Sequence, residues 1–324
     1  MPRHRIELWT RGFQILFPRP PANISELFKV VEKYSGKASL IMPAVPPVFK
    51  RINAYGNKDG YDLSALSIAV SGAGPLPLGI RKRFEEITGA IMIEGYGLSE
   101  ASPVTHVNPI DGVCKDGTIG LPLSDTYIKI MDKETGQKEL PPLPFSVAES
   151  GGMTPEQAEA ADAFTGELVI KGPQVMKGYL NCSIDTTNTI RDGWLYTGDI
   201  ACVDADGYTI IRDRLKDVIK YRGYTVFPAE VEDLLHQHPD VKNAAVIGVT
   251  DRKGDEIVKA FIELYPESVG KVTEKDIHLW AKKNMAHHKV PSIIEFRDDL
   301  PVNTLGKVLR RTLRDEERVK GAHD

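Results

Sequence analysis

The chain has 324 residues, of which 41% are hydrophobic and 27% are charged, a composition typical of a globular protein with more than one core. The 41 Lys and Arg against 45 Asp and Glu give a formal net charge of −4, which argues against a general nucleic-acid-binding surface. Apolar runs such as 244–249 are far shorter than the roughly 20 residues that a membrane helix needs. The first 17 residues also lack the uninterrupted apolar core of a signal peptide. We therefore expect a cytoplasmic protein with at most peripheral membrane contact and no nucleic-acid partner.

Helix-like and short strand-like segments alternate between residues 22 and 110. Apolar residues recur with helical spacing in 24–36, and the runs 39–42 and 66–71 are short, apolar and bounded by turn residues. This alternation predicts α/β units on a parallel sheet. We also expect tight glycine turns at 72–77 and 95–97, each following a strand, where open α/β sheets bind ligands.

The predicted pattern of helices and strands changes twice along the chain. We expect residues 1–116 to be α/β and residues 117–213 to be β-rich, with a mobile surface insertion at 141–166 that lies away from the motifs. Residues 214–324 alternate helices and strands in a compact α+β unit of domain size. The prediction is therefore an α/β fold with a β-rich section (1–213), followed by a smaller α+β domain.

Patterns that suggest metal sites are weak. The stretch 204–208, "DADGY", begins like a calcium loop but lacks the later acidic positions, so we expect a hairpin turn. His287 and His288 are adjacent, and adjacent helical residues point about 100° apart, so a pair at a helix end is expected. The widely spaced cysteines form no CxxC pattern and are expected to be buried small hydrophobes. They are Cys114, Cys182 and Cys202.

The loop "EGYGLSEAS" at 94–102 carries residue types suited to a nucleotide. Gly95 and Gly97 allow close approach of a flat ligand, and Tyr96 offers a stacking ring. Glu100 offers a hard carboxylate suited to Mg²⁺. By itself this loop is as consistent with an ordinary surface turn.

The stretch "PVNTLGKVLRR" at 301–311 contains a Gly-Lys pair but is not a phosphate loop, because Val308 follows Lys307 where Ser or Thr would be required. Its basic residues run directly into the acidic stretch 315–317. Alone, it is typical of a solvated terminal helix.

Five stretches in order change these interpretations: 70–77, 94–102, 193–199, 212–232 and 301–307. Together they resemble the motifs of the adenylate-forming superfamily, and the medium- and long-chain fatty acid–CoA ligases look most similar. The resemblance runs from about residue 13 to the end and implies an acetyl-CoA synthetase-like fold whose last domain is a lid. It implies activation of a fatty acid by ATP to an acyl-adenylate, followed by transfer to coenzyme A. ATP/AMP, Mg²⁺ and coenzyme A are thus the implied ligands.

Roles are implied residue by residue. Asp199 would bind both ribose hydroxyls with support from Arg214, and Lys216 would be the hinge of the lid. Lys220 and Gly223 would serve thioester formation, Lys307 would be the adenylation lysine, and Glu100 would bind Mg²⁺ and assist catalysis. The remaining implied cofactor-binding residues are Gly72, Ala73, Gly74, Glu94, Gly95, Tyr96, Gly97, Leu98 and Ser99.

The sequence departs from the superfamily mainly by an absence: nothing in it resembles the Ser/Thr/Gly-rich phosphate loop that precedes these motifs. We therefore expect that the first half of the superfamily fold is missing, that this chain alone is inactive or impaired, and that residues 13–110 expose apolar surface. Ser99, Val302 and Asn303 are smaller departures. Two alternatives stay open: a non-catalytic or split-enzyme subunit that needs an N-terminal partner polypeptide, and an adenylation domain with another acyl acceptor.

Overall fold

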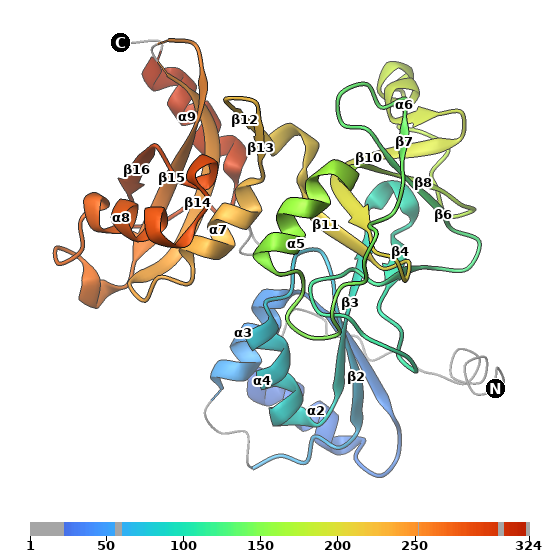
Figure 1. The fold of residues 1–324 in the computed structure, drawn as a ribbon. Coiled ribbons are helices and arrows are strands. Elements are labelled where there is room, and N and C mark those ends of the chain that lie inside the picture. Colours follow the sequence, from blue (N-terminus) through green and yellow to red (C-terminus); the bar gives the residue numbers. More distant parts are fainter. Residues whose placement is uncertain (1–22, 56–59, 252, 304–307, 322–324) are drawn as a thin grey trace.

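The computed structural model describes residues 23–55, 60–251, 253–303 and 308–321 (Figure 1). Within these residues, no helix is both long enough and apolar enough to cross a membrane. The expected lysine Lys307 and the N-terminal residues 1–22 lie outside the described residues.

A five-stranded sheet with the order β1-β2-β3-β4-β5 forms the first part of the fold. The strands β1 (Leu40–Ala44), β2 (Leu66–Ser71) and β3 (Ile91–Gly97) are parallel, which confirms the predicted α/β units. The strands β4 (Val104–Val107) and β5 (Leu121–Pro122) continue the sheet in antiparallel fashion, which the sequence patterns did not predict.

Three helices pack on one face of this sheet: α2 (Ile24–Lys33), α3 (Pro46–Ala54) and α4 (Leu78–Thr88) (Figure 1). The Asn23 side chain caps α2 by accepting a hydrogen bond from the Ser25 N–H, which satisfies one of the free donors at the helix start. The core they share is apolar and includes Phe28, Val31, Phe49, Ile52, Phe84, Ala69 and Met92.

The opposite face of the three parallel strands carries a row of isoleucines. Ile41, Ile68 and Ile91 are register partners across β1, β2 and β3. They point away from the helices, because their strand neighbours Ala69 and Met92 belong to the helix-side core and successive side chains alternate between faces. Ile41 and Ile91 are each 48% exposed. The sequence predicts exposed apolar surface within residues 13–110, and this face of the sheet provides it.

The expectation of a tight turn at 95–97 is wrong, because β3 continues through these residues. Tyr96 is paired with His106 of β4, and Gly97 is paired with Val104. A Cβ on Gly97 would lie 2.0 Å from the carbonyl oxygen of Pro103. Gly97 is thus required by the close crossing of two backbone segments, not by a turn.

The β-rich section forms a second sheet with the order β11-β10-β8-β6-β7, with β9 paired to β10. Antiparallel β10 and β11 are joined by residues 204–208, which confirms the predicted hairpin turn. The short helix α6 (Ser183–Thr189) precedes β9. The strands are β6 (Tyr127–Met131), β7 (Glu139–Leu140), β8 (Gly166–Lys171), β9 (Ile190–Arg191), β10 (Trp194–Val203) and β11 (Thr209–Arg214).

The expected mobile insertion at 141–166 is packed into the fold. It contains the helix α5 (Pro155–Ala160), begun by a capping box of Thr154 and Gln157, and the 3₁₀ helix η2 (Ala161–Phe164). Its buried apolar residues form a small core with Cys202 and Ile210 of the second sheet. They were not recognised because they are too widely spaced to form a periodic pattern; they are Leu143, Val147 and Ala161.

The last part of the chain forms a third, three-stranded sheet with the order β14-β15-β16 beside the hairpin β12–β13. Every buried residue in the hydrophobic core around this sheet comes from position 219 or later in the chain. This supports our proposal of a domain boundary near residue 214. The strands are β12 (Ile219–Tyr221), β13 (Tyr224–Val226), β14 (Val241–Thr250), β15 (Glu256–Leu264) and β16 (Ile293–Phe296), and the helices are α7 (Pro228–Leu235), α8 (Glu274–Asn284) and α9 (Arg310–Gly321).

The cysteines do not all follow the prediction. Cys202 is buried, but Cys114 is half-buried and Cys182 is exposed. His287 and His288 lie in a separate 3₁₀ helix, η5 (His287–Lys289), after the end of α8. In the described part of the chain, no three or more His, Cys, Asp or Glu side chains cluster closely enough to hold a metal ion.

Candidate functional site

Three residues far apart in the sequence meet at one carboxylate. The Tyr96 hydroxyl donates a hydrogen bond to Asp199 Oδ2 at 2.6 Å, and Arg214 Nε lies 3.2 Å from Asp199 Oδ1. Burial, together with the neighbouring Asp199 charge, raises the pKa of Tyr96 far above its ordinary value, so Tyr96 stays a donor at neutral pH. The structure thus unites three of the expected site residues.

An irregularity in β10 presents Asp199. Residues 197–199 bulge out between two paired positions of β10 and β8. The Thr197 hydroxyl donates to the Leu168 carbonyl and accepts the Asp199 N–H, while the Gly198 N–H donates to Glu167 Oε1. Gly198 has φ 71°, a left-handed conformation that favours glycine. The Thr-Gly-Asp sequence therefore holds the carboxylate at a fixed place on the sheet.

The loop 72–74 lies beside β3, as expected for two motifs that frame one ligand. The Gly72 N–H donates to the Ala44 carbonyl at 3.2 Å, and a Cβ on Gly72 would lie 3.6 Å from the Gly95 carbonyl oxygen. Ala73 has φ 65°, an uncommon conformation for a residue with a Cβ. A Cβ added to Gly74 would meet no neighbouring atom within 4 Å.

Glu94 lines a small cavity of about 30 Å³, which is room for about one water molecule. Burial raises the pKa of Glu94 to about 8, and the Leu76 N–H and the Arg81 charge offset only part of that effect. Leu76 lines the same cavity as Glu94, so the loop 72–77 lies next to β3 here. No sequence pattern indicated this cavity, because Arg81, Asn108 and Asp116, which line it with Glu94, come from a helix and a loop.

Glu100 follows β3 in the 3₁₀ helix η1 (Ser99–Ala101), and its Oε1 accepts a hydrogen bond from the Tyr179 hydroxyl at 2.8 Å. Ser99 is exposed and Leu98 packs partly against the core of the second sheet. Mg²⁺ is commonly bound by one or two carboxylates together with substrate phosphates. A single half-buried carboxylate here fits that kind of site.

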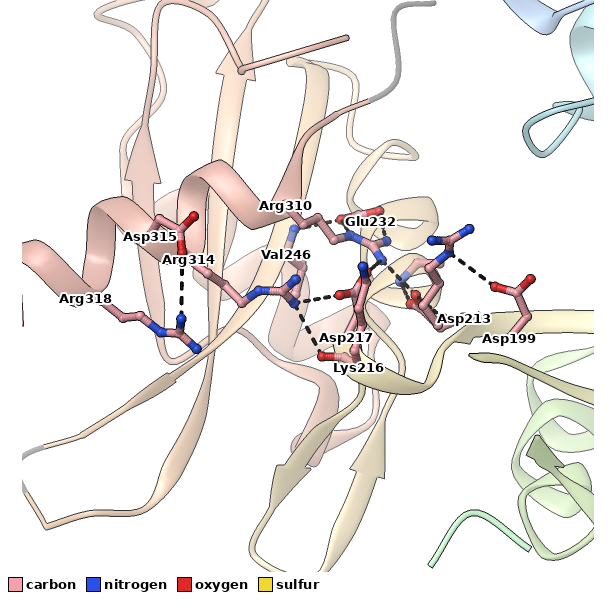
Figure 2. A network of polar contacts seen from close by, with 12 residues as sticks. Asp199, Asp213, Lys216, Asp217, Glu232, Val246, Arg310, Arg314, Asp315 and Arg318 are labelled. Carbon is pink, nitrogen blue, oxygen red and sulfur yellow. Dashed lines mark hydrogen bonds and ion pairs between the residues drawn. The ribbon is translucent and has the colours of Figure 1, made fainter. Parts of the chain in front are cut away.

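The expected hinge lies inside a dense network of charges (Figure 2). Lys216 itself is exposed, and it belongs to the 3₁₀ helix η3 (Leu215–Asp217), where its carbonyl accepts a hydrogen bond from Arg314 at 3.5 Å. Arg310, the first residue of α9, contacts Asp213 at 2.7 Å and Glu232 of α7 at 2.5 Å. Arg310 and Glu232 were not predicted, although both lie within or next to the motifs.

Lys220 and Gly223 occupy the β12–β13 hairpin and do not contact Asp199. The Lys220 ammonium lies 2.6 Å from Glu134 Oε1 of the β6–β7 turn. Gly223 has φ 86°, and a Cβ added to it would meet no neighbouring atom within 4 Å, so the backbone conformation of the hairpin turn is what requires glycine here. Their expected role in thioester formation stays a prediction.

The segment 141–166 touches the motif that begins at Arg212, so the expectation that it lies away from the motifs is wrong. The Arg212 guanidinium donates to the Ala158 carbonyl at 3.1 Å and lies 3.4 Å from both Asp162 Oδ1 and Glu230 Oε2. Arg212 lies on β11 and Glu230 lies on α7. This buried cation therefore joins the packed segment to the last domain.

Two family descriptions match the chain: "AMP-binding enzyme" over residues 8–180, and "AMP-binding enzyme C-terminal domain" over residues 230–307. The chain belongs to the AMP-binding enzyme family. The first match alone covers more than half of the 324 residues, and it contains the loop 72–74 and the β3 motif.

Curated members of the AMP-binding enzyme family resemble the chain over nearly its whole length. It is 37% identical to a long-chain-fatty-acid–CoA ligase of Bacillus subtilis over 306 residues, which cover 94% of this chain and 50% of the relative. It is 36% identical to 4-coumarate–CoA ligase 3 of Oryza sativa, with 85% of this chain and 46% of the relative covered. The chain spans about half the length of the curated relatives that it matches.

Solved structures confirm the predicted fold class. ATP-bound MatB from Rhodopseudomonas palustris superimposes with a TM-score of 0.78 at 27% identity, over 97% of this chain and 56% of MatB. The anthranilate CoA ligase AuaEII, in complex with anthranoyl-AMP, superimposes with a TM-score of 0.73 at 28% identity, over 95% of this chain and 55% of AuaEII. The chain therefore has the fold of about half of these structures, including the small last domain.

The Glu94 carboxyl predicts a pH dependence of stability. Because its pKa is about 8 in the folded protein and 4.5 ordinarily, the folded chain keeps a proton between these values that the unfolded chain releases. Wild-type stability therefore falls as pH rises through this window. Glu94→Gln removes the titration, so its melting temperature relative to wild type should rise by roughly 4 °C or more between about pH 5 and about pH 8.5.

The matched control is Glu86→Gln, which changes an exposed carboxylate on α4. Its melting temperature relative to wild type should stay constant over the same range. Equal pH profiles for the Glu94 and Glu86 variants in differential scanning calorimetry would contradict the buried, protonated state of Glu94.

Proposed function

We propose that this chain supplies the ribose site and the lid of an ATP-dependent, AMP-forming fatty acid–CoA ligase. The observation that carries the proposal is the meeting of Tyr96, Asp199 and Arg214, because a fixed, half-neutralised carboxylate is suited to accept hydrogen bonds from two neighbouring hydroxyls. Fatty acids are proposed as substrates because several of the similar curated relatives are named long-chain-fatty-acid–CoA ligases.

In the first proposed step, an oxygen of the fatty acid carboxylate attacks the α-phosphorus of ATP, and the bond to the leaving pyrophosphate breaks. Asp199 holds the ribose, and the loop 72–74 and β3 frame the adenine. Lys307 would act between the two anionic reactants, where a positioned cation stabilises transition-state charge and contributes roughly 100- to 1000-fold in rate. Its place in space is outside the described residues, so this role rests on its sequence motif.

In the second proposed step, the coenzyme A thiolate attacks the acyl carbon of the acyl-adenylate and AMP leaves. The last domain would turn about Lys216 between the steps, bringing Lys220 and Gly223 toward the reacting groups. The positions of Lys216 in η3 and of Lys220 in the adjacent hairpin are compatible with such a movement. Mg²⁺ held by Glu100 would supply positive charge at the ATP phosphates when bound.

The isolated 324-residue chain is expected to have little or no ligase activity. Its sequence contains no Ser/Thr/Gly-rich phosphate loop, and it spans about half of its curated relatives. Positioning of reacting groups contributes about 7 to 11 kcal/mol to catalysis, so loss of contacts to the β- and γ-phosphates has a large effect.

Ribose recognition can be tested without activity. In isothermal titration calorimetry, the wild-type chain should bind AMP roughly 10- to 100-fold more tightly than 2′,3′-dideoxy-AMP, because hydrogen bonds to a charged group contribute about 1.5–3 kcal/mol. Asp199→Asn should weaken AMP binding and remove most of this preference.

The control is Asp192→Asn, which changes an exposed aspartate of the neighbouring turn that already has a left-handed conformation. It should bind both nucleotides like the wild type. An absence of AMP binding, or an unchanged ribose preference in the Asp199 variant, would refute the proposed site.

A second candidate is a split-enzyme subunit that needs an N-terminal partner polypeptide. The row of Ile41, Ile68 and Ile91 favours it, because Ile41 and Ile91 are exposed and Ile68 is only partly buried within the described residues. The edge strand β1 also leaves one side of its backbone unpaired in the described sheet. A partner with its own parallel α/β units would cover the isoleucine face and pair with the edge of β1.

This candidate predicts co-purification. When the chain is co-expressed with the part of the Bacillus subtilis ligase that precedes the matched region, the two should co-purify and form fatty acyl-CoA. Ile41→Asp with Ile91→Asp should abolish both results, whereas Val269→Asp, a change at an exposed residue of the last domain, should not. Equal yields with both variants would rule out this face as the interface.

A further inference from the structure

The turn between β6 and β7 is held rigid by one carboxylate. Asp132 accepts hydrogen bonds from the backbone N–H groups of Thr135 at 2.7 Å, Lys138 at 2.9 Å and Gln137 at 3.0 Å. These bonds hold the pKa of Asp132 well below its ordinary value. The turn therefore keeps its shape at neutral pH and presents its tip in a fixed direction.

The tip of this turn contacts the last domain. Glu134 Oε1 lies 2.6 Å from the Lys220 ammonium, and the neighbouring Lys133 ammonium lies 5.8 Å from the centre of the Phe227 ring. Burial and the nearby Lys220 charge lower the pKa of Lys133. Residues 133 and 134 thus meet segments that follow Lys216, the proposed hinge, in the sequence.

Lys220 is held from two sides. Its backbone N–H donates to Glu256 Oε2 at 2.7 Å within the last domain, while its ammonium reaches across to Glu134. Both side chains of the Lys220–Glu134 pair are about half exposed or more, at 49% and 67%. Ion pairs this exposed are weak and sensitive to salt, which suits a contact that must be broken repeatedly.

We propose that Glu134 is a positioning residue for Lys220: the 132–138 turn is a docking post that holds the Lys220 ammonium in this pose of the lid and releases it when the lid turns. The role in thioester formation rests on the proposed function, but the docking contact itself does not. While Glu134 holds the ammonium, Lys220 is withheld from the acyl-adenylate, and thioester formation has to wait for the movement.

Carbodiimide cross-linking tests the contact directly, because it joins a carboxylate to an amine only when they touch. A reference pair lies on the same sheet: Lys129 and Glu139, 2.7 Å apart, with exposed fractions of 37% and 54%. Peptide mass spectrometry of the ligand-free chain should find the Lys220–Glu134 and Lys129–Glu139 links in yields within about 3-fold of each other. A Lys129–Glu139 link without a Lys220–Glu134 link would overturn the docking post.

Acylation of lysines by an N-hydroxysuccinimide ester gives a second readout. Glu134→Gln should raise the acylation rate of Lys220 by about 3- to 10-fold, and Glu134→Asp should preserve part of the protection. The matched control Glu139→Gln should raise the rate at Lys129 and leave Lys220 unchanged. An unchanged Lys220 rate in Glu134→Gln would contradict the proposal.

Release is tested by adding AMP and coenzyme A before the carbodiimide. The Lys220–Glu134 link should fall by at least about 3-fold relative to the Lys129–Glu139 link, whereas an unchanged ratio would show a fixed structural contact and overturn the release step. Nucleotide binding is measured independently by the calorimetry described for Asp199. A failure of the proposed function and a failure of the docking post are therefore distinguishable.

Discussion

The contact between Arg310 and two carboxylates connects the parts of this protein that its proposed function needs. Arg310 binds Glu232 through Nε at 2.8 Å and Nη2 at 2.5 Å, and it binds Asp213 through Nη1 at 2.7 Å. The side chains are largely buried, with exposed fractions of 15% for Arg310, 3% for Asp213 and 16% for Glu232. Removal of one partner from such a group leaves an uncompensated buried charge, which costs about 3–5 kcal/mol.

The end of β11 links this network to the ribose site. Asp213 bonds Arg310 of the last domain, and its neighbour Arg214 contacts Asp199 of the second sheet. Consecutive residues of a strand point to opposite sides. The end of β11 can therefore contact both Arg310 and the ribose-site residue Asp199. Arg310 lies three positions after Lys307, and a backbone bridge between Val302 and Val308 flanks the stretch that contains Lys307. The same network thus anchors the start of α9 close in sequence to the motif of the proposed adenylation lysine.

Motifs and periodicity predicted the fold class well, because helix and strand periods are local properties. The parallel order of β1 to β3 and the turn at 204–208 followed from short patterns. The glycine pattern at 95–97 misled, because Gly97 is needed where Pro103 crosses it, and a crossing is not local in sequence. The prediction of a mobile insertion at 141–166 was wrong for a similar reason, because the buried residues of this segment pack against residues of β10 and β11 that are distant in sequence.

For the candidate site, the residue types were predictable but several of their partners were not. The resemblance named Tyr96, Asp199 and Arg214 without indicating that the tyrosine hydroxyl binds the aspartate. Glu94 was expected near a ligand, but its raised pKa depends on burial that only the folded chain has. No sequence pattern pointed to Glu134, because its proposed role depends on a contact with Lys220, which is 86 positions away in the sequence.

Hydrogen exchange measured by mass spectrometry tests the anchoring role of Arg310 most directly. In Arg310→Met, the amides of α7 and α9 should exchange roughly 100-fold faster than in the wild type, because Asp213 and Glu232 lose their buried partner. The control Arg311→Met removes an arginine whose side chain is 86% exposed and should leave these rates unchanged. Equal protection of α7 and α9 in both variants would contradict the account.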